Sequence, residues 1–139
     1  MDDRGHRTVP HTADLRVEAW APTRQECLAE ALRGLIDSFA DVTGAPAQRI
    51  TERSVLAATD ADMLAAAAEE IIYLLDAEGR IPVNLQVRPV TGGVVLELGL
   101  AAADAVEITG AAPKAVSFHG LRFGPDHAGR WSASMTVDV

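Results

Sequence analysis

Two aspartates near the ends of the chain are the residues whose types most clearly could do chemistry. Asp14 closes the run His11–Asp14, which reads His-Thr-Ala-Asp, and Asp138 precedes the last residue, Val139. In a turn, an aspartate such as Asp14 commonly accepts backbone N–H bonds. If the end of the chain is docked, Asp138 and the terminal carboxylate of Val139 are held in place. Carboxylates and a carbonyl brought together form a hard-oxygen site that suits Ca²⁺ or Mg²⁺ rather than zinc. The pattern leaves open whether Asp14 joins them.

Four other side chains carry weaker signals. His11, which begins the run that ends at Asp14, is a candidate functional residue but is a weak signal by itself. His119 ends a predicted strand and could line a cleft. Glu70 stands at the edge of a helical apolar stripe, so it could be half-buried and functional, although a solvated acidic face is the default reading. Cys27 lies within a helical pattern, where a buried structural thiol is expected. The sequence has no GxSxG elbow, no phosphate-binding glycine loop and no Cys/His zinc spacing.

The elements that position the two aspartates are strands. Residues 15–21 alternate between apolar and polar side chains, and Asp14 is in phase with the outward set. Residues 131–139 alternate to the end of the chain, with these side chains expected to face outward: Ser132, Ser134, Thr136 and Asp138. The intervening odd-numbered residues are expected to face the core.

Two helices are expected between these strands. Thr23–Glu26 is a capping box, and the apolar stripe that follows it contains Leu28, Ala31, Leu32, Leu35, Ile36 and Phe39. The second helix begins after Thr59 and ends at Gly79. Further strands are expected at 49–57, in a hairpin around 91–93 and at 114–119. This order predicts a single domain, 1–139, of the α+β class: a two-layer sandwich with both helices on one face of a largely antiparallel sheet.

The charge balance limits the partners. The formal net charge is -8, and Lys114 is the only lysine. Without a basic stripe, direct tight binding of nucleic acid is not expected, whereas a cation or a basic protein surface fits. The acidic N-terminus and the absence of a run of about 20 apolar residues predict a cytoplasmic protein without a membrane span.

Four segments together resemble the archease family. They are the run ending at Asp14, the stretch Glu70–Glu78, the stretch Lys114–Gly120 and the final Val137–Val139. The resemblance implies an accessory protein, not an enzyme, that promotes guanylylation and multiple turnover of a GTP-dependent RNA ligase in tRNA splicing and RNA repair. It also implies a bound divalent cation, typically Ca²⁺ with Mg²⁺ as the alternative. Its ligands would be Asp14, Asp138 and the backbone oxygen of Val139.

The resemblance assigns a functional role to Lys114 as well. Pro113 departs from the family pattern, and because proline cannot donate a ladder hydrogen bond, the strand near Lys114 is expected to start late. Two rival functions remain open at this stage. One is a metal-dependent phosphohydrolase that uses Asp14, Asp138 and His119, and the other is a general chaperone-like binding module.

Overall fold

The computed structural model describes residues 3–11 and 14–139, and of Pro10 and His11 only the backbone. In chain order the elements are β1 (Gly5–His11), β2 (Asp14–Ala21), α1 (Arg24–Asp37), β3 (Ala40–Asp41), β4 (Arg49–Leu56), α2 (Asp60–Glu78), β5 (Arg80–Val90), β6 (Gly93–Ala102), the 3₁₀ turn η1 (Ala103–Ala105), β7 (Glu107–Ile108), β8 (Ala115–Pro125) and β9 (Trp131–Asp138).

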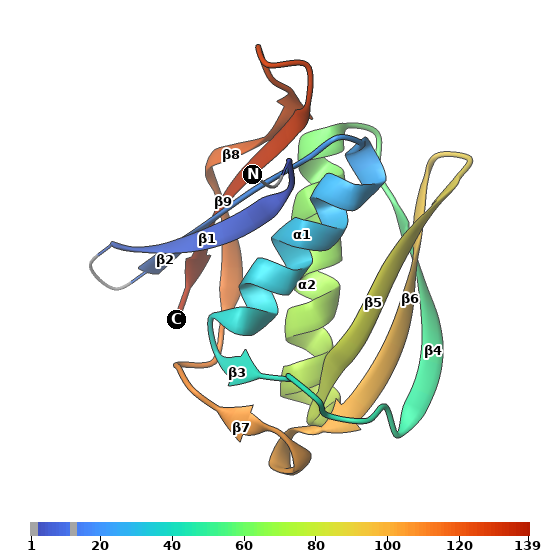
Figure 1. Ribbon diagram of the computed structural model, residues 1–139, viewed down its shortest axis with the longest axis vertical. Helices are drawn as coiled ribbons and strands as arrows, with labels where there is room; N and C mark the ends of the chain where they lie inside the picture. Colours follow the sequence, from blue (N-terminus) through green and yellow to red (C-terminus); the bar gives the residue numbers. More distant parts are fainter. Residues whose placement is uncertain (1–2, 12–13) are drawn as a thin grey trace.

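The strands form three separate antiparallel sheets. The largest has the order β1-β2-β9-β8, a second has the order β4-β6-β5, and β3 pairs with β7. Figure 1 shows the two helices in the middle of the molecule, with the four-stranded sheet on one side and the three-stranded sheet on the other. The predicted α+β fold, with two helices against antiparallel strands, is confirmed. The division of the strands into separate sheets could not be read from their pattern.

Both helices begin where the sequence predicts, and α2 ends there too, whereas α1 ends at Asp37, two residues before the last residue of its predicted stripe, Phe39. The Thr23 hydroxyl accepts a bond of 3.2 Å from the Glu26 N–H, and the Thr59 hydroxyl accepts one of 3.1 Å from the Asp62 N–H. Gly79 ends α2 in the left-handed conformation, with φ of 63°. The Glu26 carboxylate lies 3.0 Å from the Arg4 guanidinium, which ties the start of the chain to α1.

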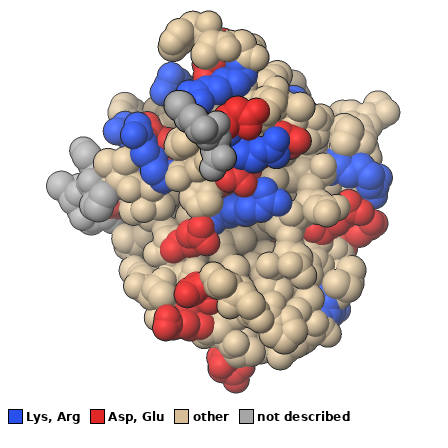
Figure 2. Space-filling view, in the orientation of Figure 1, with Lys and Arg blue, Asp and Glu red and all other residues tan. Residues whose placement is uncertain are grey.

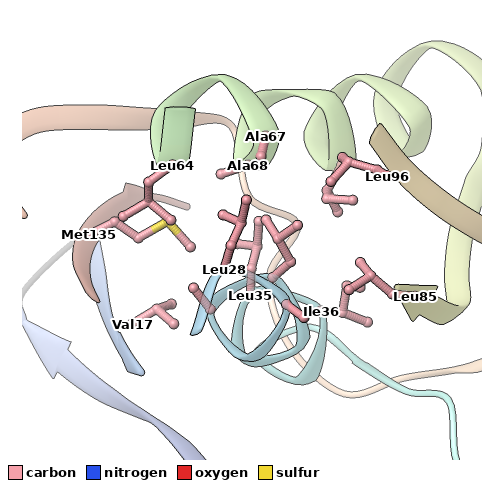
Figure 3. Close-up of a cluster of buried hydrophobic side chains, with 14 of the residues drawn as sticks. Val17, Leu28, Leu35, Ile36, Leu64, Ala67, Ala68, Leu85, Leu96 and Met135 are labelled. Atoms are coloured by element: carbon pink, nitrogen blue, oxygen red, sulfur yellow. The ribbon is translucent and has the colours of Figure 1, made fainter. Parts of the chain in front are cut away.

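The core is built mainly from aliphatic side chains on both helices and on the inner faces of the sheets, together with a few Phe and Met residues. The whole predicted stripe of the first helix is buried, from Leu28 to Phe39. Figure 3 shows Leu28 and Leu35 of α1 among side chains from α2 and the sheets, including Leu64, Leu96 and Met135. The described part of the chain contains no helix long and apolar enough to cross a membrane.

Two local features were not foreseen from the sequence. Residues 5–11, for which no element was expected, form the edge strand β1, which pairs with β2 along its length, from Gly5 opposite Trp20 onward. Its residues do not alternate, so its strand conformation comes from pairing with β2 rather than from its own pattern. Ser134, expected to face solvent, is only 5% exposed. It lies mid-sheet between Glu18 and Arg122, whose longer side chains share its face.

Cys27 is a fully buried free thiol, as expected. Burial raises its pKa from 9.0 to about 12, with smaller contributions in the same direction from Asp126 and Glu30. Because thiolate is the reactive form, we predict that the native protein reacts with iodoacetamide at pH 8 at least about a thousandfold more slowly than the protein in guanidinium chloride. Equal reactivity of the folded and unfolded protein would contradict the burial.

Burial of Cys27 also predicts a pH dependence of stability. Because the thiol ionises at a lower pH in the unfolded protein than in the folded one, the free energy of unfolding should fall as the pH rises from about 9 towards 12. Cys27→Ala should reduce this dependence on pH.

Gly93 of β6 lies directly opposite Leu56 of β4, against the backbone of that strand. A Cβ at this position would collide with the Val55 carbonyl oxygen and lie 2.9 Å from the Leu56 Cα, both backbone atoms that cannot move aside cheaply. We predict that Gly93→Ala lowers the free energy of unfolding by about 1–3 kcal/mol in urea denaturation. Gly124→Ala is the matched control, because nothing lies within 4 Å of its added Cβ. An equally small effect of both substitutions would be inconsistent with this packing.

Candidate functional site

The register of the four-stranded sheet brings the two sequence-predicted aspartates together. Asp14 is the first residue of β2 and lies directly opposite Asp138, the last residue of β9. The same row continues to His11 on β1 and Ala115 on β8. Directly opposed residues of an antiparallel pair project from the same face, so both carboxylates lie on one face at this edge. Figure 1 shows the C-terminus beside the start of β2. We call this row the aspartate edge.

The two carboxylates form an arrangement that a cation would stabilise. Cβ atoms of directly opposed residues lie about 4.5–5.5 Å apart, and like charges at that spacing destabilise the pair. Asp14 is half-buried and Asp138 is exposed, so the edge is open to solvent on one side. A divalent cation between the carboxylates would offset their repulsion, and the residues present therefore fit such an ion.

The donor set also indicates which ions fit. Among the described residues there is no group of three or more His, Cys, Asp or Glu side chains that could hold a metal. A cage made of side chains alone is therefore not present in that part of the chain. Two carboxylates completed by a backbone oxygen, such as that of Val139, and by water are typical of Ca²⁺ and Mg²⁺ sites.

Lys114 is held against the aspartate edge by its backbone. Its N–H donates a bond of 2.7 Å to the carbonyl oxygen of Asp138. Strand β8 begins one residue later, at Ala115, so the expected late start after Pro113 is confirmed. The Lys114 side chain borders a hollow of about 530 Å³ whose other lining residues include Asp76 and Leu75 of α2. The proximity of Asp76 to this lysine could not be read from the sequence, because the two residues lie on different elements.

A second hollow, of about 270 Å³, lies beside the aspartates. It is lined by Asp14, Arg16, His119, Gly120 and Thr136. The structure therefore brings His119 to the side of Asp14, as a cleft residue. Arg16 and Thr136 were missed as site residues. Their signal was present in the sequence, because each lies two residues from one of the aspartates and shares its outward phase.

Of the other two predicted residues, Glu70 is not brought into this arrangement. Glu70 is half-buried rather than fully solvated, and its carboxylate lies 3.1 Å from Arg53 of β4, in the three-stranded sheet. It lines neither of the two hollows next to the aspartate edge. Thr12, Ala13 and the side chain of His11 lie outside the described residues, so the role predicted for His11 stays a prediction.

The surface charge is mixed on the face drawn in Figure 2. Basic and acidic side chains alternate in the upper part of this face, and no continuous basic stripe crosses it. Several of the arginines are paired, with Arg33 lying 2.7 Å from Glu30 and Arg7 lying 2.5 Å from Glu18. Pairing of this kind reduces the positive potential that a polyanion would need.

Comparison with known proteins identifies relatives with the same elements. Residues 6–139 match the sequence model of the Archease protein family. Two proteins named "Probable protein archease", from Mycobacterium tuberculosis strains CDC 1551 / Oshkosh and ATCC 25618 / H37Rv, are each 47% identical over 135 residues, which cover 97% of this chain and 75% of theirs.

Two solved structures share the fold. The solution structure of Methanobacterium thermoautotrophicum protein 1598 has a TM-score of 0.72 at 19% identity and covers 97% of this chain and 99% of its own. The crystal structure of a Thermotoga maritima protein, described as "an archease, possible chaperone", has a TM-score of 0.63 at 21% identity and covers 94% of each chain. The family match spans both the run that ends at Asp14 and the terminal strand that carries Asp138. This chain belongs to the archease family.

Proposed function

We propose that this protein is an accessory factor that promotes guanylylation and multiple turnover of a GTP-dependent RNA ligase, through a divalent cation held at the aspartate edge. The observation that carries the proposal is the direct pairing of Asp14 with Asp138. The proposal is also supported by membership of the archease family, because the resemblance to that family implies the same two residues as ligands.

Each residue at the aspartate edge would have a distinct role in holding the ion. Asp14 and Asp138 hold the ion from adjacent strands, and the Val139 backbone oxygen completes the protein ligands. The bond from the Lys114 N–H to the Asp138 carbonyl fixes the end of β9, so the carboxylate is positioned before any partner arrives. When bound, the cation supplies positive charge for phosphate oxygens.

Activation requires that the accessory factor bind one state of the ligase better than another. A partner shifts a conformational equilibrium only by its differential affinity for the two states. An exposed carboxylate at the tip of a sheet, backed by packed helices, can enter a nucleotide-binding mouth without rearranging its own fold. We infer that the aspartate edge docks there and favours the ligase conformation that accepts GTP.

The proposed metal site predicts how the stability of Asp138→Asn compares with that of the wild type, and the comparison depends on whether a divalent cation is present. Without divalent cations, Asp138→Asn should be as stable as the wild type or more stable by up to about 1 kcal/mol, because the substitution removes the cross-strand repulsion. With Ca²⁺ at about 100 times its dissociation constant, the wild type should gain about 2.7 kcal/mol and the variant much less. Thermal unfolding with EDTA, Ca²⁺ or Mg²⁺ measures both effects. Asp104→Asn, at an exposed position in η1, is the control. Equal stabilisation of wild type and Asp138→Asn by the ion would remove Asp138 from the site.

The ligase role makes a separate prediction. Asp14→Asn and Asp138→Asn should each lower the stimulated rate of ligase guanylylation by roughly tenfold or more, since each removes a ligand from a site with few others. The measurement is transfer of labelled GMP to the purified ligase, with and without this protein. Asp104→Asn should stimulate as the wild type does. Full stimulation by both folded variants, Asp14→Asn and Asp138→Asn, would rule out a mechanism that depends on a cation at the aspartate edge.

The two rival functions give different outcomes in the same assays. A phosphohydrolase, suggested by the position of His119 next to Asp14, would release phosphate from nucleotides by itself and stop with EDTA. A general chaperone, the role named as possible for the Thermotoga maritima protein, would suppress aggregation of unrelated clients and would not depend on Asp138.

A further inference from the structure

We propose that the hollow beside the aspartate edge binds a phosphate monoester, whose oxygens are shared between the cation and the side chains of Arg16, His119 and Thr136. This inference rests on the proposed function, because it needs the cation held by Asp14 and Asp138. It adds a ligand to that site and assigns residues to it: the cation is one half of the binding site, and the lining of the hollow is the other half.

The charge of Arg16 is the first argument. Its side chain is exposed, and within the described part of the chain it makes no hydrogen bond or ion pair, whereas most other arginines there are paired with carboxylates. A divalent cation would neutralise the two aspartates. The guanidinium of Arg16 would then be a positive charge in the hollow without a carboxylate partner among the described residues, which favours an anion there. Arginine is the side chain best suited to bind phosphate through two parallel N–H bonds.

The spacing within the sheet is the second argument. Arg16 and Thr136 are direct cross-strand partners, one same-face step from the pair formed by Asp14 and Asp138. Two residues along a strand span about 7 Å. The long side chain of Arg16 covers that distance, so one phosphate could contact the cation through one oxygen and Arg16 through another. The Thr136 hydroxyl can donate a further bond from the opposite strand.

The irregular pairing of β8 with β9 also supports the phosphate site. Its register against β9 shifts between Ser117, opposite Thr136, and Arg122, opposite Ser134, so four residues of β8 face one residue of β9. Gly120 has φ of 72° in this segment, and the His119 N–H donates a bond of 3.1 Å to the Ser117 hydroxyl. Bulges often re-aim side chains near functional sites. Here the bulge lies in the segment that puts His119 at the wall of the hollow, which Arg16 also lines.

These features together match one class of ligand. The hollow offers a guanidinium, an imidazole, a hydroxyl and, with the ion bound, a cation, all of which can contact phosphate oxygens. Its volume of about 270 Å³ leaves room for such a group and for water on the ion. Binding of the monoester and of the cation must then be cooperative, because each supplies contacts or neutralises charge for the other.

The test is a titration of ¹⁵N-labelled protein followed by NMR, first with Ca²⁺ and then with methyl phosphate. In the wild type, methyl phosphate should bind at least about tenfold more tightly with Ca²⁺ than with EDTA. Arg16→Gln should keep the Ca²⁺ affinity within about threefold and lower the methyl phosphate affinity by about tenfold or more. Arg122→Gln is the matched control, because Arg122 is exposed on the same sheet face, is likewise unpaired among the described residues and lies outside this hollow.

The outcomes separate this inference from the proposed function. If Ca²⁺ binds but methyl phosphate does not, or if Arg16→Gln and Arg122→Gln have the same affinity for methyl phosphate, the phosphate site is overturned. The proposed cation site at the aspartate edge is then unaffected. If the wild type binds no divalent cation, both proposals fail. Guanosine 5′-monophosphate and a short RNA with a 3′-phosphate then identify the source of the monoester. If the protein binds either of these two ligands more tightly than methyl phosphate, the assignment of a phosphate monoester site is supported. If it binds neither of them, the assignment is overturned.

Discussion

The antiparallel pairing of β2 with β9 is the constraint on which the rest of the structure depends. It joins the beginning of the chain to its end in full register, from Asp14 opposite Asp138 to Ala21 opposite Trp131. Because β1 and β8 attach to the two outer sides of this pair, it forms the centre of the four-stranded sheet. A slip of β2 by one residue would turn Val17 outward and move Asp14 to the face opposite Asp138. The buried inner face therefore fixes the position of the polar site on the outer face.

The helices make that register costly to change. Val17 and Met135 are buried beneath α1 and α2, with exposures of 1% and 0%. Close packing of α1 on the sheet needs a residue without a side chain at Gly34, where a Cβ would lie 2.9 Å from Val17 and 3.1 Å from His6. His6 in turn lies 2.7 Å from Asp37 and 3.2 Å from Glu30, so the edge strand β1 is tied to the same helix. The aspartate edge thus extends from a rigid base, which is what a preorganised ion site requires.

The polar surroundings of the edge come from departures from regular structure. Pro113 delays the start of β8 and leaves the Lys114 N–H to bond the end of β9. The bulge after Ser117 carries His119 into the hollow that Arg16 and Thr136 line from the flat part of the sheet. Regular strands position the carboxylates, while the irregular segments bring the neighbouring cationic and hydrogen-bonding groups. Both proposals for this protein, a cation at the edge and a phosphate beside it, rest on this division.

The amino-acid sequence by itself determined the features that depend on local chemistry. The caps at Thr23 and Thr59, the left-handed stop at Gly79 and the alternation of β2 and β9 follow from side-chain type and period. It also pointed to the two aspartates through their shared outward phase. Only the tertiary structure decided that they oppose each other, that Glu70 pairs with Arg53 instead and that Arg16 joins the site. Strand order and register arise from packing between residues far apart in the chain, and local periodicity contains no information about which strand a given strand will pair with.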